Sequence, residues 1–306
     1  LINATLSQKY KTTATVGNLN NHIGVPLTLL SMTKDTEIGI VEMGANHQKE
    51  IEFLCNIAKP DYGYITNFGK AHLEGFGGVE GVIKGKSEMY NFLINNNKTI
   101  FVNGNDAIQV EKTKDANTFI FGNNSSFNVK IEFIEAQPNV KVNYNTLTIQ
   151  SHLIGEYNFN NIAAAITIAN YFKVPPNDIK TAIENYEPTN NRSQIIHKNT
   201  NKIILDAYNA NPSSMRAALA SFEKQPGYKI AVLGDMFELG KEAKTEHQNI
   251  ADLALSLEID SIIFVGENFY QSKMNSEKAS KFKTFEDLKN YSDISKLKNS
   301  LILIKG

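Results

Sequence analysis

The stretch that decides the fold is YGYITNFGKAHLEGFGGVEGVIKGKSEMYNFLINNNKTIFVNG, residues Tyr62 to Gly104. It opens with a short apolar segment, continues through a glycine-rich loop, and carries apolar residues at three-to-four spacing from Val79 to Ile94. That spacing predicts a helix, and the apolar segment TIFVNG that follows predicts a second strand. A strand, a helix and a second strand in this order are typical of a parallel βαβ unit. The stretch therefore predicts an α/β fold.

The same alternation of strands and helices extends in both directions along the chain. Predicted strands before this stretch are TATVG and EIGIVEMG, and a second series begins near Ser193 with KIILDAY, KIAVLGDM, SIIFVGE and SLILIKG. Residues 117–150 interrupt the rhythm with period-two stretches, which predict antiparallel hairpins at the edge of the first sheet. The proline and asparagines of YEPTNN, residues 186–191, favour a domain boundary at this point. We therefore predict two domains, residues 1–188 and 189–306, each with a mostly parallel sheet.

Composition excludes several functional classes. A chain of 306 residues has the length of two domains. Because 31 basic residues nearly balance 32 acidic ones, no global field attracts nucleic acid or an acidic membrane surface, and a small-molecule partner is favoured. The single cysteine, Cys55, excludes an internal disulfide and favours a reducing compartment such as the cytoplasm. The longest apolar runs are far below the roughly 20 residues of a membrane helix.

The tripeptide Gly85-Lys86-Ser87 looks like the end of a phosphate-binding P-loop. A P-loop requires a glycine five positions before the Gly that precedes its lysine, and that position here is Glu80. A carboxylate at the rim would also repel phosphate. We therefore predict that this tripeptide is not a P-loop.

Lys86 nevertheless lies in an unusual place. The apolar stripe of the predicted helix contains Val79, Val82, Ile83, Tyr90 and Leu93, and Lys86 falls within it, whereas Glu80, Ser87 and Asn91 lie off it. One interpretation is that its long side chain reaches past its neighbours to water. The alternative is that burial lowers its pKa and leaves a neutral amine. Such an amine can take up carbon dioxide, and the resulting carbamate is an anion that suits Mg²⁺.

Two further candidates follow predicted strands of the same sheet. Glu42 comes after EIGIV and could either bind a cation or cap the next helix. His72 lies in the glycine-rich loop beside Glu74, where it could be an ordinary surface residue or a ligand. Because ligands bind at the carboxyl ends of parallel strands, Glu42, His72 and Lys86 could form one site.

Polar residues also mark the starts of later helices. In GEYNFNNIAAA, Asn158, Asn160 and Asn161 could cap a helix or form hydrogen bonds to an adenine. In LDAYNANPSSM, Asp206 ends a predicted strand, and Asn211 followed by proline satisfies a helix start without any further function. VLGDMFELG repeats the second pattern with Asp235 and Glu238.

Six motifs taken together resemble the Mur ligase family, which are ATP-dependent amide ligases of peptidoglycan synthesis. They are GNLNNHIGVPLTLL, VEMGANHQKEI, ITNFGKAHLEGFGG, GEYNFNNIAAA, DAYNANPSSMRAAL and LGDMFELG, in family order from Gly17 to about His247, with a fainter match at LILIKG. NANPSSM and AHLEGFG favour the member that adds D-alanyl-D-alanine to UDP-N-acetylmuramoyl-tripeptide over its sister ligases and folylpolyglutamate synthase. The resemblance implies a central ATPase domain followed by a Rossmann-like α/β domain.

The resemblance also implies roles for individual residues. It implies ATP and Mg²⁺ as cofactors, with Glu42 and His72 as metal ligands and Lys86 as a carbamylated metal ligand, so that His72 and Lys86 are catalytic. For the nucleotide it implies Asn158 and Asn161 near the adenine, Arg192 near the phosphates and Asp206 near the ribose. It further implies contacts to the nucleotide or the dipeptide from Tyr208, Asn209 and Asn211. A role for His247 in the site is implied more weakly. The implied reaction passes through an acyl phosphate. No nucleic acid or membrane insertion is expected, and a monomer is expected.

The sequence departs from the family pattern at both ends. The family's P-loop is expected immediately before residue 1, preceded by an N-terminal domain, and the family continues beyond Lys305-Gly306 with a serine and a final helix. We therefore expect these 306 residues to be inactive on their own and the longer parent protein to be the enzyme. Alternative hypotheses are a non-catalytic homologue that binds nucleotide or peptide, another Mur ligase, or a folylpolyglutamate synthase.

Overall fold

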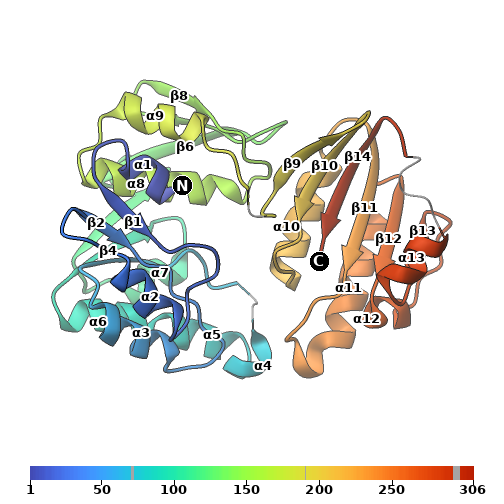
Figure 1. The fold of residues 1–306 in the computed structure, drawn as a ribbon, viewed down its shortest axis with the longest axis horizontal. Helices are drawn as coiled ribbons and strands as arrows, with labels where there is room; N and C mark the ends of the chain where they lie inside the picture. The colour runs from blue at the N-terminus through green and yellow to red at the C-terminus, as the bar shows by residue number, and fades with distance from the viewer. Residues whose placement is uncertain (70–71, 190, 292–296) are drawn as a thin grey trace. The chain divides into compact units, whose positions relative to one another are not determined.

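The computed structural model describes residues 1–69, 72–189, 191–291 and 297–306, which form two compact units (Figure 1). Unit 1 comprises Leu1–Glu135, Asn139–His152 and Tyr157–Tyr186, and unit 2 comprises Ala136–Pro138, Leu153–Glu156 and Glu187–Gly306. Both units contain helices packed on sheets that are mostly parallel. The predicted α/β fold class is confirmed. No helix within the described ranges is long and apolar enough to cross a membrane.

Unit 1 contains a small sheet and a large one. The small sheet is a parallel pair, β1 (Thr12–Ala14) with β2 (Ile38–Ile40). The large sheet has the order β3 (Tyr62–Tyr64), β4 (Thr99–Asn103), β5 (Thr118–Gly122), β6 (Val129–Glu135), β7 (Lys141–Tyr144) and β8 (Leu147–Gln150). Neighbours from β3 to β6 are parallel, whereas β6 to β8 form an antiparallel meander. The antiparallel edge was predicted, but β5 belongs to the parallel part.

Helices cover these sheets. They are α1 (Ile2–Leu6), α2 (Gly24–Leu30), α3 (Glu50–Ala58), α4 (Leu73–Phe76), α5 (Val79–Lys86), α6 (Glu88–Asn95), α7 (Ala107–Lys112), α8 (Asn158–Tyr171) and α9 (Pro176–Glu184). The central helix is α8, whose residues 162–169 are all buried and which packs on α1, β4 and β5. A helix that is apolar on nearly every side belongs in a core.

One predicted helix is divided in the structure. The sequence predicts a single helix from Val79 to Ile94, but α5 ends at Lys86 and α6 begins at Glu88, with Ser87 between them. Gly85 lies two residues before Ser87, and a glycine and serine close together are a common cause of a bend in a helix. Burial also differs from the predicted stripe. Val79 is 40% exposed and Ser87 is only 8% exposed, so the predicted stripe was wrong at these two positions.

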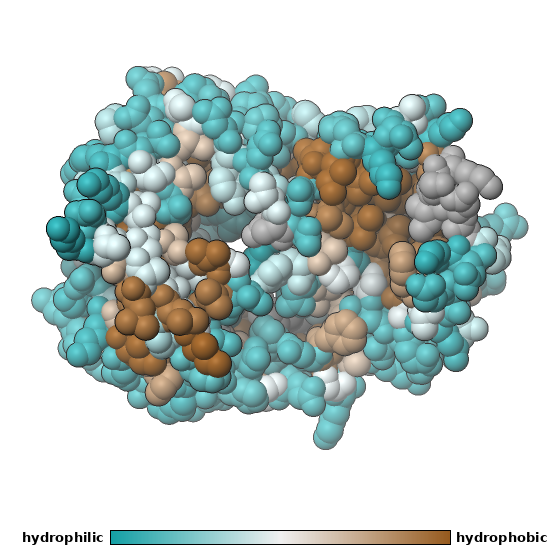
Figure 2. All heavy atoms as spheres, in the orientation of Figure 1, coloured by the Kyte–Doolittle hydropathy of each residue, from teal (hydrophilic) through white to brown (hydrophobic). Residues whose placement is uncertain are grey.

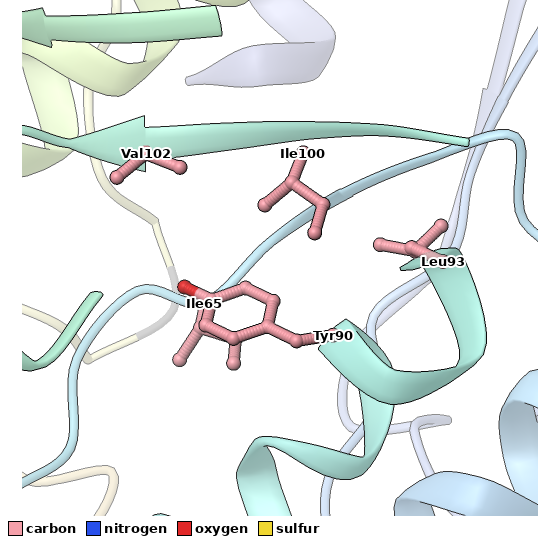
Figure 3. Packing of buried hydrophobic residues seen from close by; sticks show 5 residues of the cluster. All are labelled: Ile65, Tyr90, Leu93, Ile100 and Val102. Carbon is pink, nitrogen blue, oxygen red and sulfur yellow. The ribbon is translucent and has the colours of Figure 1, made fainter. Parts of the chain in front are cut away.

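The helix α6 is fixed by apolar packing on the sheet (Figure 3). Tyr90 and Leu93 of α6 pack with Ile100 and Val102 of β4 and with Ile65 of the segment that follows β3. Burying a side chain of this size stabilises the fold by about 1.5–3 kcal/mol. This packing therefore holds α6 in place, together with the adjoining end of α5 that carries Lys86.

One face of unit 1 is apolar and exposed. Figure 2 shows hydrophobic atoms gathered over the region of α2. The exposed apolar side chains of α2 and the loop before it include Val16, Ile23, Leu27 and Leu30, and Leu30 is 80% exposed. Contiguous apolar surface of this kind is typical of an interaction surface.

Unit 2 is built on one six-stranded sheet of order β13, β12, β11, β14, β10, β9. Its strands are β9 (Gln194–Lys198), β10 (Asn201–Asp206), β11 (Tyr228–Gly234), β12 (Ser261–Val265), β13 (Ala279–Phe282) and β14 (Ser300–Lys305). Its helices are α10 (Pro212–Glu223), the 3-10 helix η1 (Gly240–Glu242), α11 (Ala243–Ser256), α12 (Glu267–Gln271) and α13 (Phe285–Tyr291). All neighbouring strands are parallel except β9 with β10. The strands β9 and β13 were not predicted.

Candidate functional site

The tripeptide that resembles the end of a P-loop lies in a helix. Gly85 and Lys86 are the last two residues of α5, so their backbone does not form a phosphate-binding loop. The prediction that this segment is not a P-loop is confirmed. The Lys86 side chain is partly buried, and Nζ donates a hydrogen bond to the Asn67 carbonyl at 2.7 Å. Burial lowers the pKa of Lys86 from its ordinary value. Lys86 therefore loses its proton more readily in the protein than a lysine side chain does in water.

Glu42 lies two residues beyond the end of β2, with its carboxylate exposed. Asn20 Nδ2 donates a hydrogen bond to Glu42 Oε1 at 2.9 Å, and the Glu42 backbone N–H donates to Thr15 Oγ1 at 2.9 Å. The next helix, α3, begins only at Glu50, so Glu42 does not cap it and that interpretation was wrong. Asn20 orients an exposed carboxylate at the carboxyl end of β2, where a ligand can reach it.

His72 immediately precedes α4, and its backbone is left-handed with φ 53° and ψ 37°. Histidine adopts this conformation more often than most residues, but the conformation still costs energy. The residues that follow are tightly packed, since a Cβ at Gly75 would lie 2.2 Å from the Asn46 carbonyl oxygen. Only a glycine permits this approach between α4 and the loop after β2.

Direct contacts link the three segments that carry Glu42, His72 and Lys86. The loop after β2 touches α4 at Gly75, and Lys86 bonds to Asn67 in the loop that leads to His72. Among the described residues, no group of three or more His, Cys, Asp and Glu side chains is arranged to hold a metal ion. A metal site formed by Glu42 and His72 would therefore need a further ligand that is not a His, Cys, Asp or Glu side chain.

Sequence reasoning missed Glu88, which is 7% exposed. Its carboxylate accepts hydrogen bonds from the Lys49 backbone N–H at 2.6 Å and from the Glu52 backbone N–H at 3.1 Å. Because α3 has no capping side chain of its own, Glu88 takes that role from a different helix. Glu88 therefore joins α3, the helix that follows the Glu42 loop, to the start of α6, which directly follows Lys86 and Ser87. Its partners are 36 and 39 residues away, so no local signal could have revealed it.

The asparagines at the start of α8 do not cap it. The N-cap is Tyr157, with no side-chain capping bond, so the capping interpretation was wrong. Asn158 is buried, Asn161 Nδ2 donates to Asn158 Oδ1 at 2.9 Å, and Asn160 Oδ1 accepts from Asn103 Nδ2 at 3.3 Å. The start of α8 is therefore surrounded by amides bonded to one another.

An open pocket of about 420 Å³ lies close to this helix start. Its lining residues are Asn105, Asn123, Glu132, Phe133, Ile134, Asn143 and Phe159, which are all in unit 1. Phe133 and Phe159 meet edge to face with ring centroids 5.5 Å apart. The pocket combines an aromatic wall with amide donors and acceptors.

In unit 2, Asp206 ends β10 and meets a buried lysine that sequence reasoning also missed. Lys305 Nζ lies 3.0 Å from Asp206 Oδ2, and the Ser193 backbone N–H donates to Asp206 Oδ1 at 3.2 Å. Lys305 is the last residue of β14 and is 2% exposed. The sequence LILIKG shows a strand that ends in a lysine, but it does not show what that lysine contacts.

The loop after β10 carries the other predicted residues of unit 2. The Arg192 guanidinium lies over the Tyr208 ring, 4.0 Å from its centroid, so the structure brings these two residues together. Asn209 is exposed, and its carbonyl accepts a bond from Lys305 at 2.8 Å. Asn211 caps α10, with Oδ1 accepting from the Ser214 N–H at 2.9 Å, as predicted for a helix start. Its side chain is therefore occupied by a structural role.

His247 belongs to α11 and is fully buried. Its Nε2 accepts from the Met236 N–H at 2.9 Å, and its Nδ1 donates to the Ala243 carbonyl at 2.7 Å, as a neutral ring protonated on Nδ1 does. Asp235 accepts hydrogen bonds from the backbone N–H groups of Asn268 and Phe269 at the start of α12. Asp235 and His247 therefore hold the loop after β11.

Comparison with known proteins identifies the family. The Mur ligase middle domain matches residues 1–169, and the glutamate ligase domain of Mur ligases matches residues 191–306. The chain belongs to the Mur ligase family.

Individual relatives indicate which members of the family this chain is similar to. The chain is 33% identical over 271 residues to UDP-N-acetylmuramoyl-tripeptide--D-alanyl-D-alanine ligase of Bacillus subtilis, covering 87% of this chain and 59% of the relative. It is 33% identical over 276 residues to the ligase of the same name from Escherichia coli, covering 86% of this chain and 60% of the relative. A crystal structure of MurF from Acinetobacter baumannii matches all of this chain and 69% of its own, with a TM-score of 0.88 and 30% identity. The chain thus spans about three fifths of the two sequence relatives.

Proposed function

We propose that this chain forms the central and C-terminal domains, residues 1–188 and 189–306, of an ATP-dependent amide ligase. The ligase adds D-alanyl-D-alanine to UDP-N-acetylmuramoyl-tripeptide in the cytoplasm, as a step in peptidoglycan precursor synthesis. The observation that carries the proposal is 33% identity, over 87% of this chain, to a relative named for that reaction. The matching fold and the linked Glu42, His72 and Lys86 segments support it.

In the proposed reaction, the terminal carboxylate of the tripeptide attacks the γ-phosphate of ATP. ADP leaves and an acyl phosphate forms. The amine of D-alanyl-D-alanine then attacks the acyl carbon, a proton leaves the nitrogen, and phosphate departs as the amide bond forms. The first step depends on positioning and charge neutralisation. We assign Arg192 to the phosphates, Asp206 to the ribose, and Asn158 and Asn161 to the adenine. We assign nucleotide or dipeptide contacts to the loop of Tyr208, Asn209 and Asn211.

The Glu42 carboxylate fits Mg²⁺. Asn20 holds the exposed Glu42 carboxylate in one orientation, and carboxylate oxygens are ligands that Mg²⁺ prefers. We propose His72 as a second ligand and a Lys86 carbamate as the third, which would be a donor other than His, Cys, Asp or Glu. Burial lowers the pKa of Lys86, so the amine loses its proton more readily than a lysine in water. The neutral amine would attack carbon dioxide through the Nζ lone pair, with loss of one proton. When bound, Mg²⁺ neutralises phosphate charge.

Phosphate release by the full-length protein tests the proposed reaction. We expect release from ATP to require both UDP-N-acetylmuramoyl-tripeptide and D-alanyl-D-alanine. L-glutamate, L-lysine and meso-diaminopimelate should not replace the dipeptide. Release that is no faster with the dipeptide than without it would refute the assignment.

Carbon-13 NMR tests the carbamate without any need for activity. The chain in ¹³C-bicarbonate should show a carbamate carbon that disappears in Lys86→Met. Because an α-amino group also forms carbamates, the comparison with the variant makes the assignment. Lys84→Met is the matched control, since Lys84 lies on the same helix but is exposed. A signal unchanged in Lys86→Met, or no signal in the wild type, would overturn the carbamate.

A further inference from the structure

We propose that Lys305 is a positioning residue for the nucleotide site of unit 2. It holds the loop from Asp206 to Asn211 in the shape that presents the Asp206 carboxylate and the Tyr208 ring. The inference rests on the proposed function, because that function makes this loop part of the nucleotide site.

The contacts of Lys305 account for all of its hydrogen-bonding capacity. An ammonium group has three N–H donors. Three oxygens lie around Nζ, namely Asp206 Oδ2 at 3.0 Å, the Asp206 carbonyl at 3.3 Å and the Asn209 carbonyl at 2.8 Å. No donor remains for a ligand. Lys305 therefore acts on the nucleotide through the loop and not by direct contact.

Packing alone does not require a lysine at this position. β14 is flanked on both sides by parallel strands, and Lys305 pairs with Asp206 of β10 and Leu233 of β11. Such central strands are usually apolar throughout, as the buried residues Leu301 and Leu303 illustrate. A buried charge is costly unless it is paired. The charge of Lys305 is thus best explained by the polar loop that it binds.

The loop is held at both of its ends. Asn211, the last residue of the loop, caps α10. Lys305 binds the carbonyl of Asp206, the first residue of the loop, and also the carbonyl of Asn209. Tyr208 lies between these two carbonyls and stacks with Arg192. The position of the Tyr208 ring, and of the guanidinium on it, therefore depends on Lys305.

The Asp206 carboxylate is oriented by the same arrangement. One oxygen accepts the Ser193 N–H at 3.2 Å, and the other faces Lys305 at 3.0 Å. These two contacts come from distant segments of the chain, the residue before β9 and the end of β14, and fix the plane of the carboxylate. Without Lys305, the Ser193 N–H is the one remaining contact of this carboxylate within the described part of the chain, and the carboxylate can rotate away from a ribose hydroxyl.

The test measures ADP binding by calorimetry and the Michaelis constant for ATP in the full-length protein. We expect Lys305→Met to weaken ADP binding at least tenfold and to raise the ATP Michaelis constant similarly. Lys229→Met is the matched control, because Lys229 Nζ donates to the Glu223 carbonyl at 2.7 Å in the same unit. The control should lower the melting temperature and change ADP affinity less than twofold.

A second variant separates binding from folding. Lys305→Met leaves the Asp206 charge unpaired, whereas Lys305→Met combined with Asp206→Asn removes both charges. The double variant should recover melting temperature. Because Asp206→Asn also removes the proposed ribose contact, its ADP affinity is compared with that of Asp206→Asn alone, and the two losses should be less than additive, since Lys305 acts through the loop that carries Asp206. Wild-type ADP affinity in either variant would overturn the role of Lys305, as would a wild-type protein that binds no ADP. Failure of the proposed reaction is distinct, since it appears as phosphate release that does not depend on D-alanyl-D-alanine.

Discussion

Replacing Glu88 with alanine tests whether this buried carboxylate holds α3 against the segment that carries Lys86. The change removes the acceptor for the Lys49 N–H at 2.6 Å and for the Glu52 N–H at 3.1 Å. Since α3 has no capping side chain of its own, both N–H groups lose their partner.

The expected loss follows from these two bonds. A helix-capping interaction contributes about 1 kcal/mol, so losing two costs about 2 kcal/mol of unfolding free energy. Glu88→Gln keeps one acceptor oxygen and should lose about 1 kcal/mol. For a unit of about 150–250 residues, the alanine variant should melt about 4–8 °C lower.

Calorimetry and amide hydrogen exchange measure the two effects. In Glu88→Ala, the amides of Lys49 and Glu52 should exchange faster than in the wild type. The matched control is Asp106→Ala, because Asp106 caps α7 through the N–H groups of Ile108 and Gln109 at 3.0 and 3.1 Å. It should lower the melting temperature while exchange at Lys49 and Glu52 stays unchanged. A Glu88→Ala variant within about 0.5 kcal/mol of the wild type, with unchanged exchange, would refute the reasoning.

Three further predictions concern other buried groups. Burial raises the pKa of Cys55 to about 12, so alkylation measured by mass spectrometry should require unfolding at pH 8. Because the unfolded thiol ionises near pH 8.5, this group's contribution to stability should fall as pH rises from about 9 towards 12. For Lys86 the pKa is lowered, so wild-type stability should rise with pH as the amine loses its proton, up to the unfolded pKa of 10.5. With carbon dioxide excluded, the urea midpoint of Lys86→Met should lack this rise. His247→Ala should cost about 3 kcal/mol in urea unfolding, because it leaves a cavity and orphans the Met236 N–H.

The sequence by itself determined the α/β class, the order of most strands and helices, and the helix start at Asn211. These features depend on apolar periodicity and on hydrogen bonds between residues close in the chain, such as the bond between Asn211 and Ser214 three residues away. The same local reasoning excluded the P-loop at Lys86, because loop length is a property of the sequence. The motifs that resemble Mur ligases were also readable in the chain itself.

Only the tertiary structure decided which charged residues are buried and what they contact. Glu88 meets amides 36 and 39 residues away, and Lys305 meets the Asp206 carbonyl 99 residues away. The division of the helix at Ser87, and the exposure of Val79 at the start of α5, likewise depend on how α5 and α6 pack. Burial and ion pairing arise when distant segments exclude water together, and local patterns do not encode which segments meet. For that reason the sequence pointed to Lys86, whereas the roles of Glu88 and Lys305 required the folded chain.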